Sequence, residues 1–382
     1  MHSLLYISVS LVNSFLALKL LKSFRKYRQK KIPSNNILNL DELPSVSVLI
    51  PARNEQNAMK ECLERVLSSN YPKMEIIVLD DNSVDNTSEE VKLYAHSGVR
   101  FVRGEEPPKG WLGRNYAYER LSDESSGDYL LFLSVDTKIS RDTIMEMVSE
   151  LKRSDSVMLS ILPSRNDNYR ASVLFSTLRY FLELIMSSRY HSPSSSSAWL
   201  INRRVLVDEL GGLSKFRQAI MPESEMANDL NNRTSELLDS PNHRYRFVID
   251  EGKFGVNFEK RWSSQIQTEQ RNFTLKIFKN APMIFIVLPV LLVHLLPFTA
   301  VIYKIVCFQF DEIFFAYLVQ TLLSMVIYGS YTSVVWSRGF WLGMILYPII
   351  VFQELCIFMY SIYRRFFGKV IWRGREINFR KF

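Results

Sequence analysis

Long apolar stretches lie at both ends of this chain and enclose a polar middle, and this pattern limits the possible folds more than any other feature. Residues 4–21 are almost entirely apolar and contain one charged residue, Lys19. That is about the minimum length for crossing a hydrocarbon core ~30 Å thick. Residues 282–303, 313–336 and 340–363 are each long enough as well. The sequence therefore predicts an N-terminal and a C-terminal membrane part.

A basic cluster follows the first apolar stretch directly. A cleaved signal peptide would end in small residues, so we expect an uncleaved anchor here. Because basic residues stay on the cytoplasmic side, the polar middle should be cytoplasmic and the chain a multi-pass protein of the cell membrane. The cluster consists of Lys22, Arg25, Lys26, Arg28, Lys30 and Lys31.

The C-terminal stretches raise a conflict of topology. Three crossings after a cytoplasmic domain would put the basic tail outside, whereas the same charge rule puts it inside. Pro289 and Pro297 interrupt the first of these stretches. One stretch is therefore expected to be re-entrant or interfacial, with the proline-containing one the first choice, and the sequence leaves this open. The basic residues of the tail are Arg364, Arg365, Lys369, Arg373 and Arg375.

The formal net charge of +8 is concentrated beside the apolar stretches. That position suits contact with anionic lipid headgroups. No RNA- or DNA-binding motif accompanies the charge, so nucleic acid is not an expected partner. Cys62, Cys307 and Cys356 are far apart, which indicates neither a disulfide framework nor a metal cluster and fits a reducing cytoplasm.

The polar middle alternates between short apolar runs and longer helix-like stretches. Such alternation predicts βαβ units and a mostly parallel sheet, whose ligands bind at the carboxyl ends of the strands. Residues 171–188 should form one amphipathic helix, either at the membrane surface or lining an acceptor cleft, with an ordinary half-buried helix as the alternative. Residues 192–197 should form a flexible loop. The expected strands are residues 46–50, 75–79, 99–102 and 129–133, and the expected helices are residues 58–68 and 87–95.

Two polar loops come directly after expected strands. The first is Pro51-Ala52-Arg53-Asn54-Glu55, and the second, residues 80–87, reads DDNSVDNT. Carboxylates at strand ends can accept hydrogen bonds from a nucleobase and from ribose hydroxyls. The second loop is also what a turn with a helix cap looks like, and Asp85 or Thr87 should serve only as a cap.

This pair of motifs resembles the opening of family 2 glycosyltransferases. The resemblance covers residues 46–115 and implies a GT-A domain, an α/β Rossmann-like fold that binds a nucleotide sugar. It also implies that Pro51, Arg53, Glu55, Asp80 and Asp81 contact the nucleotide.

Residues 107–117 read PPKGWLGRNYA. Gly110 would let the backbone approach a ligand, and Lys109 and Arg114 would suit a diphosphate, while a solvated basic turn is the alternative. The run resembles the KGWxGKNxA pattern of the subgroup that glycosylates carotenoid and other polyisoprenoid lipids, with Arg114 in place of the lysine. Residues 372–375 resemble the WxGR tail of the same subgroup.

Residues 133–137 read LSVDT, where the family has D-x-D-T. The resemblance implies that Asp136 holds a divalent metal against the diphosphate. Ser134 replaces the first carboxylate. One carboxylate together with phosphate oxygens and waters can still hold Mg²⁺ or Mn²⁺.

A general base is expected in residues 221–229, MPESEMAND, after the turn at Gly211 and Gly212. The family carries an ED motif here, and this chain lacks that dipeptide. Alignment on Ala227 puts Glu223 at the base position, with Glu225 as the alternative. The two carboxylates are left as competing candidates.

The resemblance thus implies inverting transfer of a sugar from a nucleoside-diphosphate sugar to a lipid acceptor of polyisoprenoid or carotenoid type. The expected organisation is an anchor at residues 1–21, a basic linker at 22–44, the GT-A catalytic domain at 45–275, membrane helices at 281–365 and a basic tail at 366–382.

Two alternatives stay open. One is a processive polysaccharide synthase, although the Q-x-x-R-W motif of that class has Phe258 at its glutamine position, and Trp262 is then expected to pack in the core. The other is a non-catalytic nucleotide-sugar-binding scaffold, because of Ser134 and the missing dipeptide.

Overall fold

A computed structural model describes residues 2–28, 43–165, 170–187, 191–237, 244–279, 281–336, 338–367, 370–372 and 375–377. The chain forms two compact units. The α/β unit comprises residues 27–164 and 188–259, and the helical unit comprises residues 1–26, 165–187 and 260–379. The α/β unit is shorter than the predicted domain at 45–275, because residues 165–187 and those after Glu259 pack in the helical unit.

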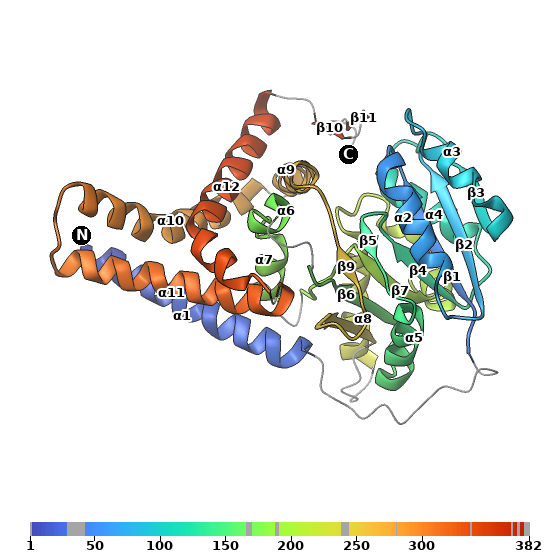
Figure 1. Ribbon diagram of the computed structural model, residues 1–382, viewed down its shortest axis with the longest axis horizontal. Coiled ribbons are helices and arrows are strands. Elements are labelled where there is room, and N and C mark those ends of the chain that lie inside the picture. Colours follow the sequence, from blue (N-terminus) through green and yellow to red (C-terminus); the bar gives the residue numbers. More distant parts are fainter. Residues whose placement is uncertain are drawn as a thin grey trace. The chain divides into compact units, whose positions relative to one another are not determined.

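The α/β unit is built on one seven-stranded sheet with the order β3-β2-β1-β4-β7-β6-β8 (Figure 1). Its pairs are parallel except where β7 lies antiparallel between β4 and β6. The predicted mostly parallel α/β fold is confirmed. The strands are β1 Val46–Ala52, β2 Met74–Asp80, β3 Val99–Arg103, β4 Tyr129–Leu133, β6 Met158–Leu162, β7 Ala198–Asn202 and β8 Tyr245–Ile249.

Strands that are buried on both faces explain the apolar runs of the sequence. Every residue of β6 is buried, and so is every residue of β1 except Pro51. Helix α5 contributes Met147, Val148 and Leu151 to the same core. The helices of this unit are α2 Gln56–Leu67, α3 Thr87–Lys92, α4 Gly113–Asp123, α5 Thr143–Ser154 and α8 Pro222–Leu237, and β5 Thr137–Lys138 pairs with β9 Asn257–Phe258. Shorter helical turns span Ala95–Ser97, Val205–Glu209 and Leu213–Phe216.

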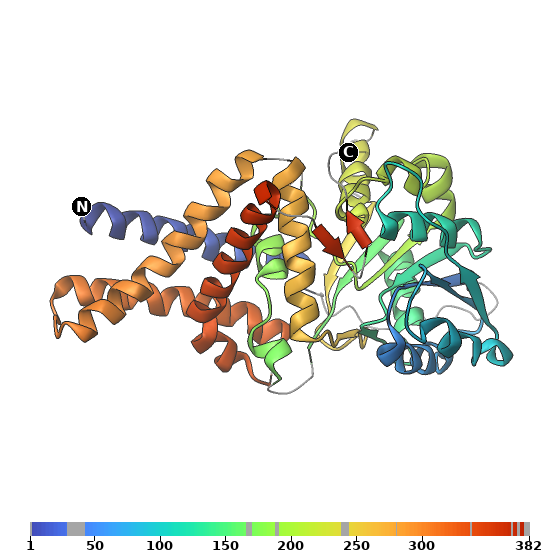
Figure 2. The same ribbon diagram turned by 90° about the horizontal axis from the view of Figure 1, so that it is seen from above.

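The helical unit contains the long apolar helices (Figures 1 and 2). Among the residues that the structure describes, four of its helices are long and apolar enough to cross a membrane, and they include both predicted membrane parts. The elements are α1 His2–Tyr27, α6 Ala171–Leu174, α7 Arg179–Ile185, α9 Trp262–Lys279, α10 Ile284–Val306, α11 Glu312–Val335 and α12 Phe340–Phe367, a short turn at Ala281–Met283, and the hairpin β10 Val370–Trp372 with β11 Arg375–Ile377. The four candidate spans are α1, α10, α11 and α12.

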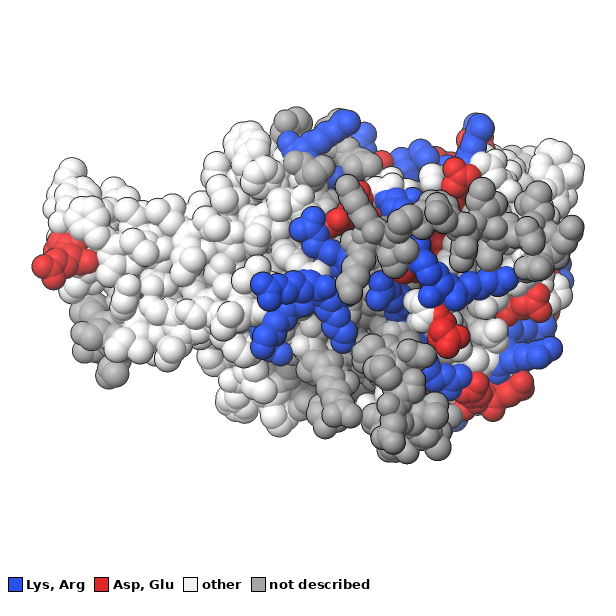
Figure 3. All heavy atoms as spheres, turned by 90° about the horizontal axis from the view of Figure 1, so that it is seen from below, with Lys and Arg blue, Asp and Glu red and all other residues white. Residues whose placement is uncertain are grey.

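The surface of these helices suits lipid. Figure 3 shows one face on which the part of these helices near the turn from α10 to α11 carries almost no charge apart from a red spot at the tip, while blue side chains gather farther from that tip. That turn contains Asp311, whose side chain caps α11 by accepting from the Phe314 backbone N–H, and Glu312. The acidic pair is therefore separated from the basic residues at the end of α1, Arg25 and Lys26.

Four local predictions were wrong. Residues 171–188 form two short helices, α6 and α7, instead of one. Helix α10 runs through Pro289 and Pro297 without a break. Trp262 does not pack in the core, because 43% of its surface is exposed and its indole N–H donates to Gln353 Oε1 (3.0 Å). The loop 192–197 is buried except for the half-buried Ser196, and it is hydrogen-bonded to the rest of the fold.

Candidate active site

The carboxyl ends of β1, β2 and β4 meet at one edge of the sheet. Strand β1 pairs in parallel with β2 on one side and with β4 on the other. The loops at residues 51–55, 80–87 and 134–137 therefore emerge at neighbouring positions, and the outer two are about 10 Å apart, twice the spacing between strands. Asp80, Asp81 and Asp136 lie along one edge and are not scattered over separate surfaces.

Hydrogen bonds join the first two loops to each other. The Asn54 backbone N–H donates to Ser83 Oγ (2.8 Å), and Val84 N–H donates back to Asn54 Oδ1 (2.9 Å). Asn54 and Asn82 both adopt left-handed backbone conformations, with φ of 54° and 52°. Asparagine tolerates this region better than most residues, which explains its use here. The two motifs form one rigid structure.

Both carboxylate oxygens of Asp80 accept hydrogen bonds from within the protein. Its Oδ1 accepts from the Ser83 N–H (3.1 Å) and from Ser83 Oγ, and its Oδ2 accepts from Ser88 Oγ. The residue is buried, with 4% of its surface exposed. A carboxylate with both oxygens engaged in this way organises the loop that contains it.

Asp81 is tied to the first loop. Arg53 donates to the Asp81 backbone carbonyl (2.5 Å), and its guanidinium lies 3.8 Å from the Asp81 carboxylate. Asp85 lies one residue before the N-cap of α3, and its Oδ1 accepts from the Thr87 N–H at the start of that helix (3.0 Å). Thr87 Oγ1 in turn accepts from the Glu55 N–H (2.8 Å). Pro51 and Glu55 are both half-buried at this edge.

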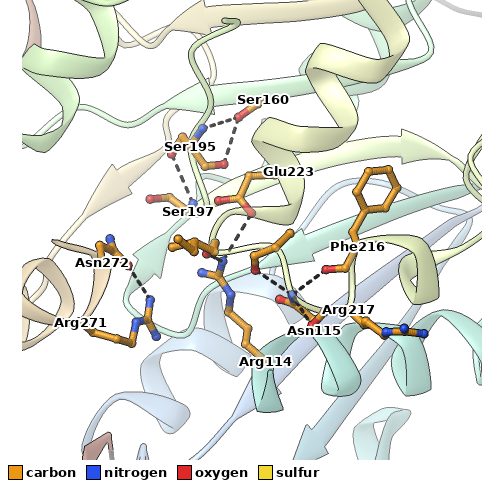
Figure 4. A network of polar contacts seen from close by, with 12 residues as sticks. Arg114, Asn115, Ser160, Ser195, Ser197, Phe216, Arg217, Glu223, Arg271 and Asn272 are labelled. Atoms are coloured by element: carbon orange, nitrogen blue, oxygen red, sulfur yellow. Dashed lines mark hydrogen bonds and ion pairs between the residues drawn. The ribbon is translucent and has the colours of Figure 1, made fainter. Parts of the chain in front are cut away.

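The motif at residues 107–117 leads into α4 and is bound to the segment before α8. Asn115, which is 1% exposed, directs its amide N–H groups to the carbonyls of Phe216 (2.9 Å), Arg217 (3.1 Å) and Ala219 (2.8 Å), as Figure 4 shows. Asn115 is a residue whose role sequence reasoning missed. Lys109 is exposed, and Gly110 has φ of 86°, which favours glycine.

Glu223 and Arg114 form a buried ion pair. Glu223 lies in the first turn of α8 with no exposed surface, and its carboxylate is 3.5 Å from the Arg114 guanidinium (Figure 4). Neither carboxylate oxygen has a hydrogen-bond partner among the described residues. Arg114 also donates to the Ile220 carbonyl (3.1 Å). Glu225, two residues further on, is exposed.

Asp136 lies half-buried in the turn between β4 and β5, next to Ser134. Burial, reinforced by the nearby charges of Asp136 and Glu55, raises the pKa of Cys62 on α2 to about 12. Asp136 and Glu55 therefore both lie close enough to the Cys62 thiol to influence its pKa. Among the described residues, no three His, Cys, Asp or Glu side chains are placed to hold a metal ion together.

The serines of residues 192–197 border this edge, because β7 starts beside the end of β4. Ser134 N–H donates to the Ser197 carbonyl (2.9 Å), and Ser195 N–H donates to Ser160 Oγ (2.8 Å). Ser192 N–H donates to Asn228 Oδ1 on α8 (2.7 Å). The predicted flexibility is wrong, because Ser192, Ser195 and Ser197 are hydrogen-bonded to other parts of the fold. The buried Ser194 hydroxyl has no partner among the described residues.

Among solved structures of similar fold is a mannosyltransferase, PcManGT from Pyrobaculum calidifontis, in complex with GDP-Man and Mn²⁺. The alignment covers 96% of this chain and 99% of that chain, with a TM-score of 0.52 and 14% identity. At this identity the likeness shows the fold alone. The fold and its loops define the α/β unit as a GT-A domain.

Residues 47–211 match the family described as glycosyl transferase family 2, so the chain carries a family 2 glycosyltransferase domain. A probable glycosyltransferase, YdaM of Bacillus subtilis (strain 168), is 31% identical over 163 residues, which are 40% of this chain and 38% of that protein. The poly-beta-1,6-N-acetyl-D-glucosamine synthase of Staphylococcus aureus (strain MSSA476) is 30% identical over 128 residues, 33% of this chain and 29% of that protein. This chain thus matches less than two fifths of the length of either relative.

Proposed function

We propose that this protein transfers a sugar from a nucleoside-diphosphate sugar to a lipid acceptor of polyisoprenoid or carotenoid type, with inversion. The single observation that carries the proposal is Glu223, a fully buried carboxylate in the family 2 domain whose oxygens accept no hydrogen bond among the described residues. Burying a charged group in this state is costly, so its retention indicates a use in binding or chemistry.

In this proposal the donor lies along the shared edge of the sheet. The nucleoside is surrounded by Pro51, Arg53, Glu55 and Asp81. Asp80 holds the conformation of the loop at residues 80–87 through its hydrogen bonds to Ser83 and Ser88. Lys109, Gly110 and Arg114 contact the diphosphate, which suits their positive charge and the open backbone at glycine.

Asp136 would hold a Mg²⁺ or Mn²⁺ ion together with the donor phosphates. The described residues fit this arrangement only in part, since they offer one carboxylate and no cluster of three ligands. Mg²⁺ in particular is commonly held by one or two carboxylates plus substrate phosphates and water. When bound, such an ion neutralises negative charge on the leaving diphosphate.

Glu223 would act as the general base. Its carboxylate takes the proton of the acceptor hydroxyl while that oxygen bonds to the anomeric carbon from the side opposite the diphosphate. The bond from the anomeric carbon to the diphosphate oxygen breaks, and the nucleoside diphosphate leaves with the electron pair. Attack from the opposite side inverts the anomeric configuration.

The apolar helices support a lipid acceptor. Four candidate spans are more than a soluble acceptor requires, and they would hold the domain where a lipid presents its polar end. We place the α/β unit on the cytoplasmic side of the cell membrane. Likeness to a poly-N-acetylglucosamine synthase favours processive synthesis as the second candidate, although Phe258, at the motif's glutamine position, is instead a strand residue paired with Thr137.

The test is transfer by the full chain in lipid nanodiscs. Radiolabelled UDP-glucose, UDP-N-acetylglucosamine and GDP-mannose are supplied with Mn²⁺ and a polyprenol-containing lipid extract, and organic-soluble label is counted. Glu223→Gln should lower transfer about 100- to 10,000-fold, the usual worth of a general base, while Glu225→Gln keeps most of it. The opposite ranking would make Glu225 the base. Label in a precipitable polymer would indicate a processive synthase, and nucleotide binding without turnover would indicate a scaffold.

A further inference from the structure

We infer that Arg114 couples the donor to the base: it pairs with Glu223 while the site is empty and shares its charge with the donor diphosphate when the site is filled. This rests on the proposed function, because it takes the donor diphosphate to lie beside Arg114. It goes beyond that proposal by giving one cation two anionic partners at successive stages of the reaction.

Three groups position Arg114. Its guanidinium donates to the Ile220 carbonyl (3.1 Å), lies 3.5 Å from the Glu223 carboxylate and stacks over the Tyr118 ring with the carbon 5.7 Å from the ring centre. Figure 4 shows the side chain rising from α4 toward Glu223. Its exposed fraction is 19%, so part of the guanidinium still faces solvent. A guanidinium has five N–H donors, and those left over can bind an anion.

Glu223 depends on this one cation. Arg114 is the only ion-pair partner found for its carboxylate within the described part of the chain, and no N–H or O–H group there donates to either oxygen. A buried charge is tolerated when an opposite charge compensates it. Two anions, the carboxylate and an incoming diphosphate, must then compete for Arg114.

Asn115 holds the start of α4, which carries Arg114, against the segment that leads into α8, which carries Glu223. Its amide joins the start of α4 to the carbonyls of Phe216 and Ala219, and the Leu112 N–H donates to the Arg217 carbonyl (3.0 Å). The backbone on both sides of Arg114 is therefore linked to the segment that precedes Glu223. Only the guanidinium needs to move when the donor binds, and the Glu223 oxygens are then open to the acceptor hydroxyl.

The experiment measures binding of UDP and GDP to the full chain by calorimetry, without acceptor. Glu223→Gln keeps the shape of the side chain and removes the competing anion, so it should bind its nucleotide about 3- to 10-fold more tightly, the size expected for one nearby charge in a partly solvated site. Asp229→Asn, which removes a carboxylate of the same helix that pairs with Lys215 instead of Arg114, should stay within twofold of the wild type. Arg114→Gln combined with Glu223→Gln should bind more weakly than the wild type, because the shared cation is gone.

Each outcome has a definite meaning. The coupling is supported if Glu223→Gln binds nucleotide more tightly than the wild type, Asp229→Asn binds it equally well and the double variant binds it more weakly. Equal or weaker binding by Glu223→Gln, in a protein whose wild type binds nucleotide and transfers sugar, overturns the coupling and leaves the proposed function intact. No binding of either nucleotide by the wild type overturns both.

Discussion

Buried carboxylates in this protein have two different environments, which separates structural residues from candidate reactive ones. Asp80 accepts hydrogen bonds from Ser83 and Ser88 through both oxygens. Glu223 accepts none among the described residues. A satisfied carboxylate stabilises the fold, whereas an unsatisfied one adds an energetic cost that a ligand can relieve.

Asp80 and Asp81 should therefore respond differently to the same substitution. In the wild type the hydroxyls of Ser83 and Ser88 donate to the Asp80 carboxylate, and Asp80→Asn would place an amide N–H donor against one of them. The mismatch should lower the free energy of unfolding by about 1–3 kcal/mol and lower the melting temperature. Asp81→Asn should leave melting nearly unchanged and weaken nucleotide binding by about 10- to 150-fold, because a hydrogen bond to a charged group contributes about 1.5–3 kcal/mol.

Thermal unfolding of the full chain in detergent and calorimetric titration with UDP and GDP give the two readings. Should Asp80→Asn melt like the wild type but lose nucleotide affinity, Asp80 would be a ligand-binding residue, contrary to this expectation.

The strand-end loops were predictable because their residues follow short apolar runs within a few positions. The partners of Arg114 and Asn115 were not, since they lie 101 to 109 residues further along the chain. Local sequence gave Arg114 a role at the diphosphate, and only the folded chain brings it to Glu223 as well.

At the scale of elements, regular strands were easier to predict than short helices. Strand β4 has the expected bounds, because an apolar run of five residues suits a buried strand. The single helix expected over residues 171–188 fails at residues 175–178, where the Leu178 N–H donates to Glu354 Oε2 (3.2 Å) on α12. A contact 176 residues away in sequence ends one helix and starts another, and periodicity does not reveal it.

Helices α1 and α11 are joined by a buried polar network. Asn13 Nδ2 donates to Gln320 Oε1 (3.0 Å), Gln320 Nε2 donates to Ser10 Oγ (2.6 Å), and Ser324 Oγ donates to Asn13 Oδ1 (3.0 Å). Interhelical hydrogen bonds of this kind fix which helix faces pair within a membrane.

Asn13→Ala and Gln320→Ala should each destabilise the helical unit by about 0.6 kcal/mol and at most about 1.7 kcal/mol. Their effects should not add, because both changes break the same network. Ser14→Ala, at an exposed position beside Asn13, is the matched control and should have no effect. Detergent-induced unfolding followed by circular dichroism measures the three values. Fully additive losses would show that the two residues act separately.

For the whole molecule, the open question is the side of the membrane on which the chain ends. Helix α12 differs from the other candidate spans in two ways. Its middle contains a fully buried carboxyl group, that of Glu354, and the second half of the helix is hydrogen-bonded to the polar helix α9. Ser361 Oγ donates to the Gln270 carbonyl (3.3 Å), and Arg365 donates to the Ile277 carbonyl. Within the helical unit, α12 packs against α9 as well as against α11.

We therefore expect α1, α10 and α11 to cross the membrane and α12 to lie along its boundary with α9, in place of the proline-containing α10 that the sequence favoured. An intramembrane carboxylate is costly, so a position at the boundary suits Glu354. Two crossings after the α/β unit bring the tail back to the same side, which satisfies the charge rule for Arg364 and Arg365. A fluorescent protein at the C-terminus should then fluoresce in a bacterial host, and alkaline phosphatase there should stay inactive. Phosphatase inserted at Gln309, in the turn between α10 and α11, should be active. Active phosphatase at both Gln309 and the C-terminus would show that α12 crosses as well.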